Sequence, residues 1–219
     1  MKVLRFIALT LLFVFLGLLL IHSLGSINQD IGRHLKLGEI IWETKSVPQT
    51  NLFSFTEPDH PFINHHWLSE VVFYLLYGII GLKGLIIFKA AIIAVSFWLI
   101  YKAADKKTGL WPFLISAPLG ALVFLNRSDV RPEILSYLFL AFFLFVILRA
   151  KYAEENWSRS PGVIEDPRYR KAISGLYALP FVQILWSNAH IYFVLGPALL
   201  LFFLIDAGFD RERKIALSK

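Results

Sequence analysis

The sequence contains about six long runs of apolar residues, and their length limits what the chain can fold into. A bilayer core about 30 Å thick needs roughly 20 apolar residues per transmembrane helix, and somewhat fewer where the membrane is thin. Pro180 and Pro197 lie inside the last two runs, which are short, so either helix could be tilted or broken. With 57% hydrophobic residues, the chain is too apolar for a soluble domain of this size. The sequence therefore predicts an all-α, polytopic transmembrane helix bundle that forms a single membrane domain over residues 1–219. The six runs cover residues 6–24, 85–101, 111–125, 134–148, 173–187 and 191–205.

The positions of the basic residues predict the orientation of the bundle. The first run follows Lys2 and Arg5, exceeds the apolar core of a signal peptide and has no clear small-residue cleavage site. We therefore expect a retained signal anchor with a cytoplasmic N-terminus. Under this topology, fifteen of the 22 lysines and arginines fall on the cytoplasmic side and six fall outside, in agreement with the positive-inside rule. Because the basic charge follows topology and no aromatic-and-basic surface accompanies it, we expect no binding to nucleic acid.

Two segments are long enough to lie outside the bilayer. Residues 26–82 are expected to form a long extracytoplasmic loop with interfacial helices. Its amphipathic run Trp67–Ile80 carries aromatic and aliphatic residues on one face, which is typical of a helix in the interface plane. Residues 150–172 mix charges of both signs with proline and glycine, and they predict a solvated cytoplasmic connector. The chain has no cysteine, so any metal would need histidines and carboxylates.

The outer face receives most of the side chains that could do chemistry. Five of the six histidines lie there, and solvation alone would not sort histidine in this way. Asp30 and His34 are four residues apart, so on a helix they share one face and could jointly hold a cation or a hydroxyl proton. Alternatively, Asp30 caps the next helix. His65 and His66 are adjacent, so both could bind one metal only from an irregular loop. Glu70 begins the amphipathic run, where a glutamate also suits the helix dipole.

Two further outer motifs contain candidate binding residues. The motif NRSDVRPE, residues 126–133, places Arg127 and Arg131 beside two acids. An arginine fork matches the geometry of phosphate, although the arginines could instead pair with the acids of the motif. The motif WSNAHIYF, residues 186–193, predicts a tight turn that carries Asn188 and His190 to the membrane surface. An asparagine can serve a turn through its backbone alone, whereas His190 is harder to explain in that way.

Five of these segments, in this order, resemble bacterial polytopic membrane proteins related to the GT-C superfamily of glycosyltransferases. They are DIGRHLKLGEII, SVPQTNLFSFT, HHWLSEVVFYLLYGIIGLKGL, VRPEILSYLFL and WSNAHIYFVLG, and they cover most of residues 27–196. The resemblance implies a bacterial inner-membrane enzyme whose active site faces outward and whose donor is a polyprenyl-phosphate-linked sugar. In that superfamily, an acidic residue just after the first transmembrane helix serves as general base or metal ligand. The matching position here is Asp30.

The resemblance also implies roles for the other candidates. Asp30 would accept the proton of the acceptor hydroxyl, and His34 would orient it or share a divalent cation with it. These two are therefore the expected catalytic residues and the expected ligands of any metal. The leaving lipid phosphate would be neutralised by Arg127 and Arg131. The sugar or acceptor site would be shaped by His65, His66, Glu70, Asn188 and His190.

The chain also departs from the superfamily pattern. The chain has about six expected helices, fewer than the usual core, so it could be a minimal member, a truncated reading frame or one half of a complex. Gln29 precedes Asp30, whereas many members carry a second acid there. Both features favour a second hypothesis, a non-catalytic membrane subunit that binds a lipid-linked sugar or a membrane-protein partner. A transporter is a third hypothesis, but Lys89 alone places a formal charge near mid-span, and a translocation path ordinarily has polar groups on several helices.

Overall fold

The computed structural model describes residues 2–21, 29–57, 59–104, 110–125, 129–157 and 165–217, and most of these residues are helical. Within them, four helical stretches are long and apolar enough to cross a membrane, namely Val3–Leu20, Trp67–Ala103, Glu133–Glu155 and Ile191–Phe209. The chain is therefore an all-helical membrane protein, as its composition predicts. The elements are α1 (Lys2–Leu20), α2 (Gln29–Thr44), α3 (Trp67–Ala103), α4 (Trp111–Leu125), α5 (Glu133–Trp157), α6 (Pro167–Ser174), η3 (Gly175–Ala178), α7 (Leu179–Ala189), η4 (Ile191–Val194) and α8 (Leu195–Leu217).

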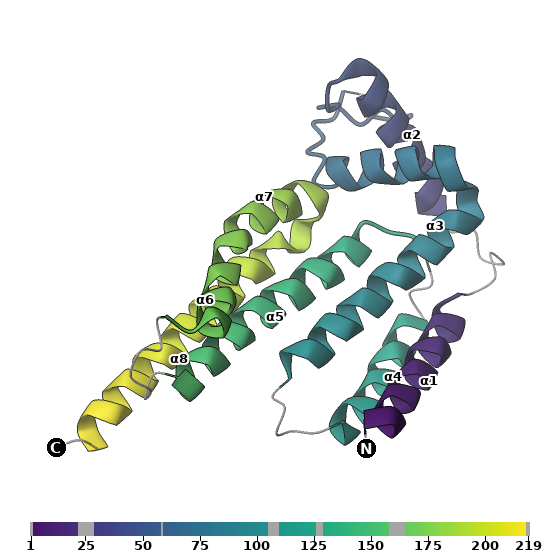
Figure 1. Ribbon diagram of the computed structural model, residues 1–219. Helices are drawn as coiled ribbons and strands as arrows, with labels where there is room; N and C mark the ends of the chain where they lie inside the picture. Colours follow the sequence, from purple (N-terminus) through teal and green to yellow (C-terminus); the bar gives the residue numbers. More distant parts are fainter. Residues whose placement is uncertain are drawn as a thin grey trace.

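The long helices lie side by side in a row (Figure 1). At one end of the row α1 packs against α4, where leucines of α1 meet Phe113, Ala117 and Ala121. The second part of α3 packs against α5, and α5 also contacts α6, α7 and α8. The helix α2 and the first part of α3 lie across the tops of the long helices (Figure 1). This transverse layer carries the candidate residues Asp30, His34 and Glu70, and His65 and His66 directly precede its α3 part.

The helix α3 is bent sharply at Gly81. This residue has φ 65° and ψ −173°, which no residue with a side chain adopts readily. The part before Gly81 runs across the ends of the other helices, and the part after it runs along them (Figure 1). The bend therefore falls between the amphipathic run Trp67–Ile80 and the apolar run 85–101 that the sequence separates.

The conformation of Gly81 leads to a first prediction. We expect Gly81→Ala to destabilise the protein by about 1–3 kcal/mol, because a Cβ is strained at this φ even though the space around it is open. Gly78→Ala is the matched control, since this residue also has open space and lies in regular helix, where alanine is favoured over glycine. The measurement is thermal unfolding of both variants in the same detergent. Equal midpoints for the two variants would contradict the strained geometry.

The apolar run 173–187 does not form one regular helix. It is divided among α6, the 3₁₀ turn η3 and α7, and Pro180 lies in the first turn of α7. Proline has no backbone N–H and clashes with the preceding turn, so a helix readily starts at such a residue, whereas a proline in the interior kinks or breaks the helix. The sequence allowed either a tilted or a broken helix here, and the structure has a broken one.

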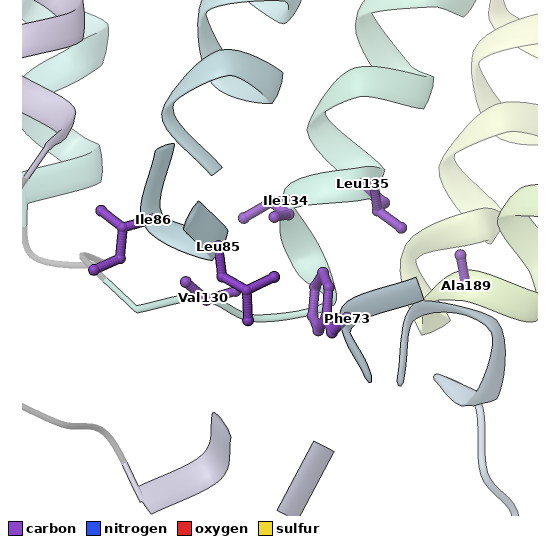
Figure 2. Packing of buried hydrophobic residues seen from close by; sticks show 7 residues of the cluster. All are labelled: Phe73, Leu85, Ile86, Val130, Ile134, Leu135 and Ala189. Carbon is purple, nitrogen blue, oxygen red and sulfur yellow. The ribbon is translucent and has the colours of Figure 1, made fainter. Parts of the chain in front are cut away.

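A hydrophobic cluster lies where the transverse layer meets the row of long helices (Figure 2). Figure 2 shows that its side chains come from both parts of α3, from the start of α5 and the residues just before it, and from the end of α7. Phe73 is fully buried at this junction, and it lies less than one helical turn beyond the polar first turn of α3. The cluster thereby fixes the position of the polar residues next to it. Its buried members are Phe73, Leu85, Ile86, Val130, Ile134, Leu135 and Ala189.

Candidate functional site

The first polar contact of the transverse layer joins α2 to α3. His34 Nδ1 lies 2.9 Å from Glu70 Oε1, and both side chains are buried. Asn64 Nδ2 donates to the other carboxylate oxygen, Glu70 Oε2, at 2.6 Å. Asn64 Oδ1 in turn accepts from the backbone N–H of His66 at 2.9 Å, just before α3 begins. The buried carboxyl group of Glu70 therefore has a partner on each oxygen, as a buried polar group requires.

A second polar contact joins α5 to the end of α7. Ser136 Oγ lies 2.9 Å from His190 Nδ1, and the indole Nε1 of Trp186 donates to the same Ser136 Oγ at 2.8 Å. All three side chains are buried. His190 lies between α7 and η4 and has an extended backbone, so neither of the two flanking helices includes it.

The ring of His66 lies between these two contacts. Its centroid is 6.0 Å from that of His34 and 5.3 Å from that of His190, with which it stacks. His66 Nδ1 is enclosed and has no hydrogen-bond partner in the described part of the chain. We refer to His34, His66 and His190, with their partners Glu70, Asn64 and Ser136, as the histidine cluster.

Burial keeps two of these imidazoles neutral at neutral pH. Desolvation lowers the pKa of His190 to about 4, and the neighbouring His66 and His34 add to the effect. Desolvation also lowers the pKa of His66, with a further contribution from His34. Both shifts follow from removing water around a group that would carry positive charge.

These shifts predict that the protein loses stability on acidification. Between about pH 4 and 6.5 the unfolded chain binds a proton at residue 190 that the folded chain does not, so the free energy of unfolding falls as pH decreases through this window. We expect His190→Gln to weaken this dependence, measured as the thermal midpoint against pH in detergent. His60→Gln, at an exposed histidine, should leave it unchanged. A wild-type midpoint that stays constant over the window would contradict the prediction.

A separate set of ion pairs joins Arg131 to Asp30 and Asp129 and includes no residue of the histidine cluster. Arg131 Nη2 is 3.2 Å from Asp30 Oδ2 and 3.4 Å from Asp129 Oδ2. The side chains of Asp30 and Arg131 are 43% and 35% exposed. Arg131 Nε is nevertheless enclosed and has no partner among the described residues. Arg131 therefore pairs with an acid of its own motif, as one reading of the sequence expects, and also with the expected catalytic acid.

The structure brings some predicted residues together and separates others. His34, His66, Glu70 and His190 meet in the histidine cluster. Asp30 and His34 lie one turn apart on α2, yet Asp30 faces Arg131 while His34 faces Glu70. Within the described ranges, no group of three histidines or carboxylates is arranged to hold a metal ion.

The remaining predicted residues lie at the edge of the cluster or outside the described ranges. Asn188 Oδ1 accepts from the indole of Trp67 at 2.9 Å, and Asn188 Nδ2 donates to the Ile184 carbonyl, so its amide ties α7 to the start of α3. His65 is exposed, with its ring 6.4 Å from that of His66. Arg127 lies outside the described residues.

Three residues of the site were not predicted from the sequence. Asn64 stands just before the adjacent histidines, and an asparagine that bonds to the backbone two residues on forms an Asx turn, a local pattern that the sequence could have indicated. Ser136 and Trp186 lie inside apolar runs and carry no such signal. Lys89 of α3 is also buried and interacts electrostatically with Asp129, which is an ion-pair partner of Arg131. Through Lys89, the charged residues around Arg131 are linked to the membrane-spanning part of α3.

Comparison with known proteins identifies no relative. No protein-family model matches the chain, and no similar protein is found among curated proteins or solved structures.

Proposed function

We propose that the chain is a membrane glycosyltransferase that moves a sugar from a polyprenyl-phosphate-linked donor to a hydroxyl acceptor on the extracytoplasmic face of a bacterial inner membrane. The observation that carries the proposal is the contact between Asp30 and Arg131 at 3.2 Å, beside the buried histidine cluster. A carboxylate and a guanidinium at the end of a helical membrane array are the two charges that such a transfer needs. The positive-inside distribution of the lysines and arginines supports about six spans with this end outside.

The ion pair supports a transfer step in which one partner is exchanged for another. The donor phosphate would bind the guanidinium of Arg131, whose side chain is 35% exposed. Phosphate competes with Asp30 for Arg131, and the released carboxylate accepts the proton of the acceptor hydroxyl. The acceptor oxygen then bonds to the anomeric carbon while the bond from that carbon to the phosphate oxygen breaks. Polyprenyl phosphate leaves with the electron pair, and Arg131 stabilises the charge that develops on it.

An apolar groove supports a lipid-linked donor. A cavity of about 1120 Å³ lies between α5, η3, α7 and α8, and its lining is mostly aliphatic and aromatic. At one end it is bordered by the ion pair between Lys151 and Asp206. Phe143 lines it and also packs against Trp186, with 5.6 Å between ring centroids. The groove thus approaches the histidine cluster through Trp186, and its walls suit a hydrocarbon chain.

A transfer assay in proteoliposomes tests the proposal. A panel of polyprenyl-phosphate sugars is supplied to the wild-type protein, with and without a chelator, and donor consumption is followed. We expect consumption of at least one donor, and the chelated sample shows whether Asp30 also requires a cation. The absence of turnover with every donor, from folded and correctly oriented protein, would overturn the enzyme proposal and favour the non-catalytic subunit.

A further inference from the structure

The proposed transfer step does not use the hydrogen bonds of the histidine cluster. These bonds determine which nitrogen of two imidazole rings donates and which accepts. A neutral imidazole has one nitrogen that donates and one that accepts, and the partner of one nitrogen decides the role of the other. In the cluster, Nδ1 of His34 and Nδ1 of His190 each have one partner, and the two partners are chemically different.

The ring of His34 is held with Nδ1 as the donor. Its partner is the carboxylate of Glu70, which only accepts hydrogen bonds when ionised. The second oxygen of that carboxylate accepts from Asn64 Nδ2, so both of its oxygens face donors. His34 Nδ1 therefore carries the hydrogen, and in the neutral form of this ring Nε2 is the nitrogen with the lone pair that can accept.

The ring of His190 is held with the opposite polarity. The indole N–H of Trp186 can only donate, so Ser136 Oγ accepts from it. The hydroxyl hydrogen of the buried Ser136 then has His190 Nδ1 as its partner. His190 Nδ1 accepts this bond, and because the ring is neutral, His190 Nε2 carries the hydrogen and can donate.

The free nitrogens of these two rings are available to a ligand. Neither His34 Nε2 nor His190 Nε2 has a partner in the described part of the chain, and neither is among the fully enclosed atoms there. The rings of His66 and Tyr192 flank His190, stacked at 5.3 Å and edge-on at 4.4 Å between centroids. The cluster itself contributes the buried carboxylate of Glu70 and, at His66 and His190, imidazoles that burial keeps neutral, so it does not suit a phosphate.

We propose that Glu70 and Ser136 are positioning residues that fix His34 as a hydrogen-bond acceptor and His190 as a donor, so that the cluster binds an uncharged, hydroxyl-bearing ring. One hydroxyl of the ligand donates to His34 Nε2, and another accepts from His190 Nε2. Identifying this ligand as the transferred or receiving sugar rests on the proposed function. Under that function, Arg131 binds the phosphate of the donor and the histidine cluster binds the neutral sugar ring.

Nitrogen-detected NMR of ¹⁵N-histidine-labelled full-length protein in detergent at neutral pH tests the polarity. We expect His34 protonated at Nδ1 and His190 protonated at Nε2, assigned through His34→Gln and His190→Gln. Glu70→Gln should convert His34 to a tautomer mixture and leave His190 unchanged, and Ser136→Ala should do the reverse. The wild-type spectrum alone decides the polarity, so a variant that fails to fold does not leave it open. The opposite tautomer at either ring would overturn the proposal.

The ligand is tested in the same sample, without any lipid donor. Glucose, galactose, mannose and arabinose are titrated separately, followed by inorganic phosphate. We expect at least one sugar to shift both Nε2 resonances to saturation, with binding weakened about tenfold in Ser136→Ala, while His60→Gln binds as wild type. No shift with any of the four sugars, or a shift of both resonances with phosphate, would overturn the proposal. Sugar binding without transfer activity would instead leave this site standing and remove the proposed function.

Discussion

Replacement of Asp30 by asparagine is expected to reduce sugar transfer by about 100-fold or more. An asparagine keeps the shape of the side chain and can still accept from Arg131 Nη2, which lies 3.2 Å from Asp30 Oδ2. It cannot take the proton that the acceptor hydroxyl loses. The effect should therefore fall on kcat rather than on KM for the donor, because the proposed contact of Arg131 with the donor phosphate does not depend on Asp30 being a carboxylate. The measurement is donor consumption in proteoliposomes at equal amounts of folded protein.

The chain offers a matched control on the same helix. Glu43 is an exposed acid near the C-terminal end of α2, and Glu43→Gln removes the same charge without touching Asp30 or Arg131. We expect this variant to retain wild-type transfer. If Asp30→Asn retained full activity, Asp30 would be an ion-pair partner of Arg131 and no more. If both variants lost activity equally, the loss would reflect the charge of α2 rather than proton transfer.

Hydropathy and single proline positions predicted most of the long helices. The run 111–125 coincides with α4, and α5 begins one residue before the run 134–148. Such segments are set by local composition, because every backbone N–H and C=O must be paired within the helix in an apolar environment. The division of 173–187 into three pieces depends on how Pro180 and its neighbours pack, and the sequence could only leave it open.

The candidate site was harder to predict because its contacts are distant in sequence. His34 and Glu70 are 36 residues apart, and they meet only because α2 folds back on the first part of α3. The spacing of Asp30 and His34 suggested a shared partner, but Arg131 and Glu70 approach them from different elements. A four-residue spacing places two side chains on one face and says nothing about what covers that face.

The contact between α2 and α3 leads to the second large prediction. Gly38 lies directly against the backbone carbonyl of Glu70, where an added Cβ would overlap with that carbonyl and with Tyr74 Cβ. Backbone atoms cannot move aside as a flexible side chain can, so α2 must shift away from α3. We expect Gly38→Ala to lower the free energy of unfolding by about 3 kcal/mol or more. Gly32→Ala on the same helix meets open space and should stabilise the protein by about 0.5–1 kcal/mol.

The same substitution should also act on the site without touching any of its side chains. A shift of α2 lengthens the 2.9 Å contact between His34 and Glu70 and moves Asp30 relative to Arg131, because both acid and histidine are carried by α2. We therefore expect Gly38→Ala, even below its unfolding temperature, to reduce transfer and to convert His34 to a tautomer mixture, whereas Gly32→Ala retains both. Thermal unfolding, the transfer assay and the histidine ¹⁵N spectrum measure the three effects. If Gly38→Ala were as stable as Gly32→Ala, α2 could not pack on α3 at this residue, and the pairing of His34 with Glu70 would lose its structural basis.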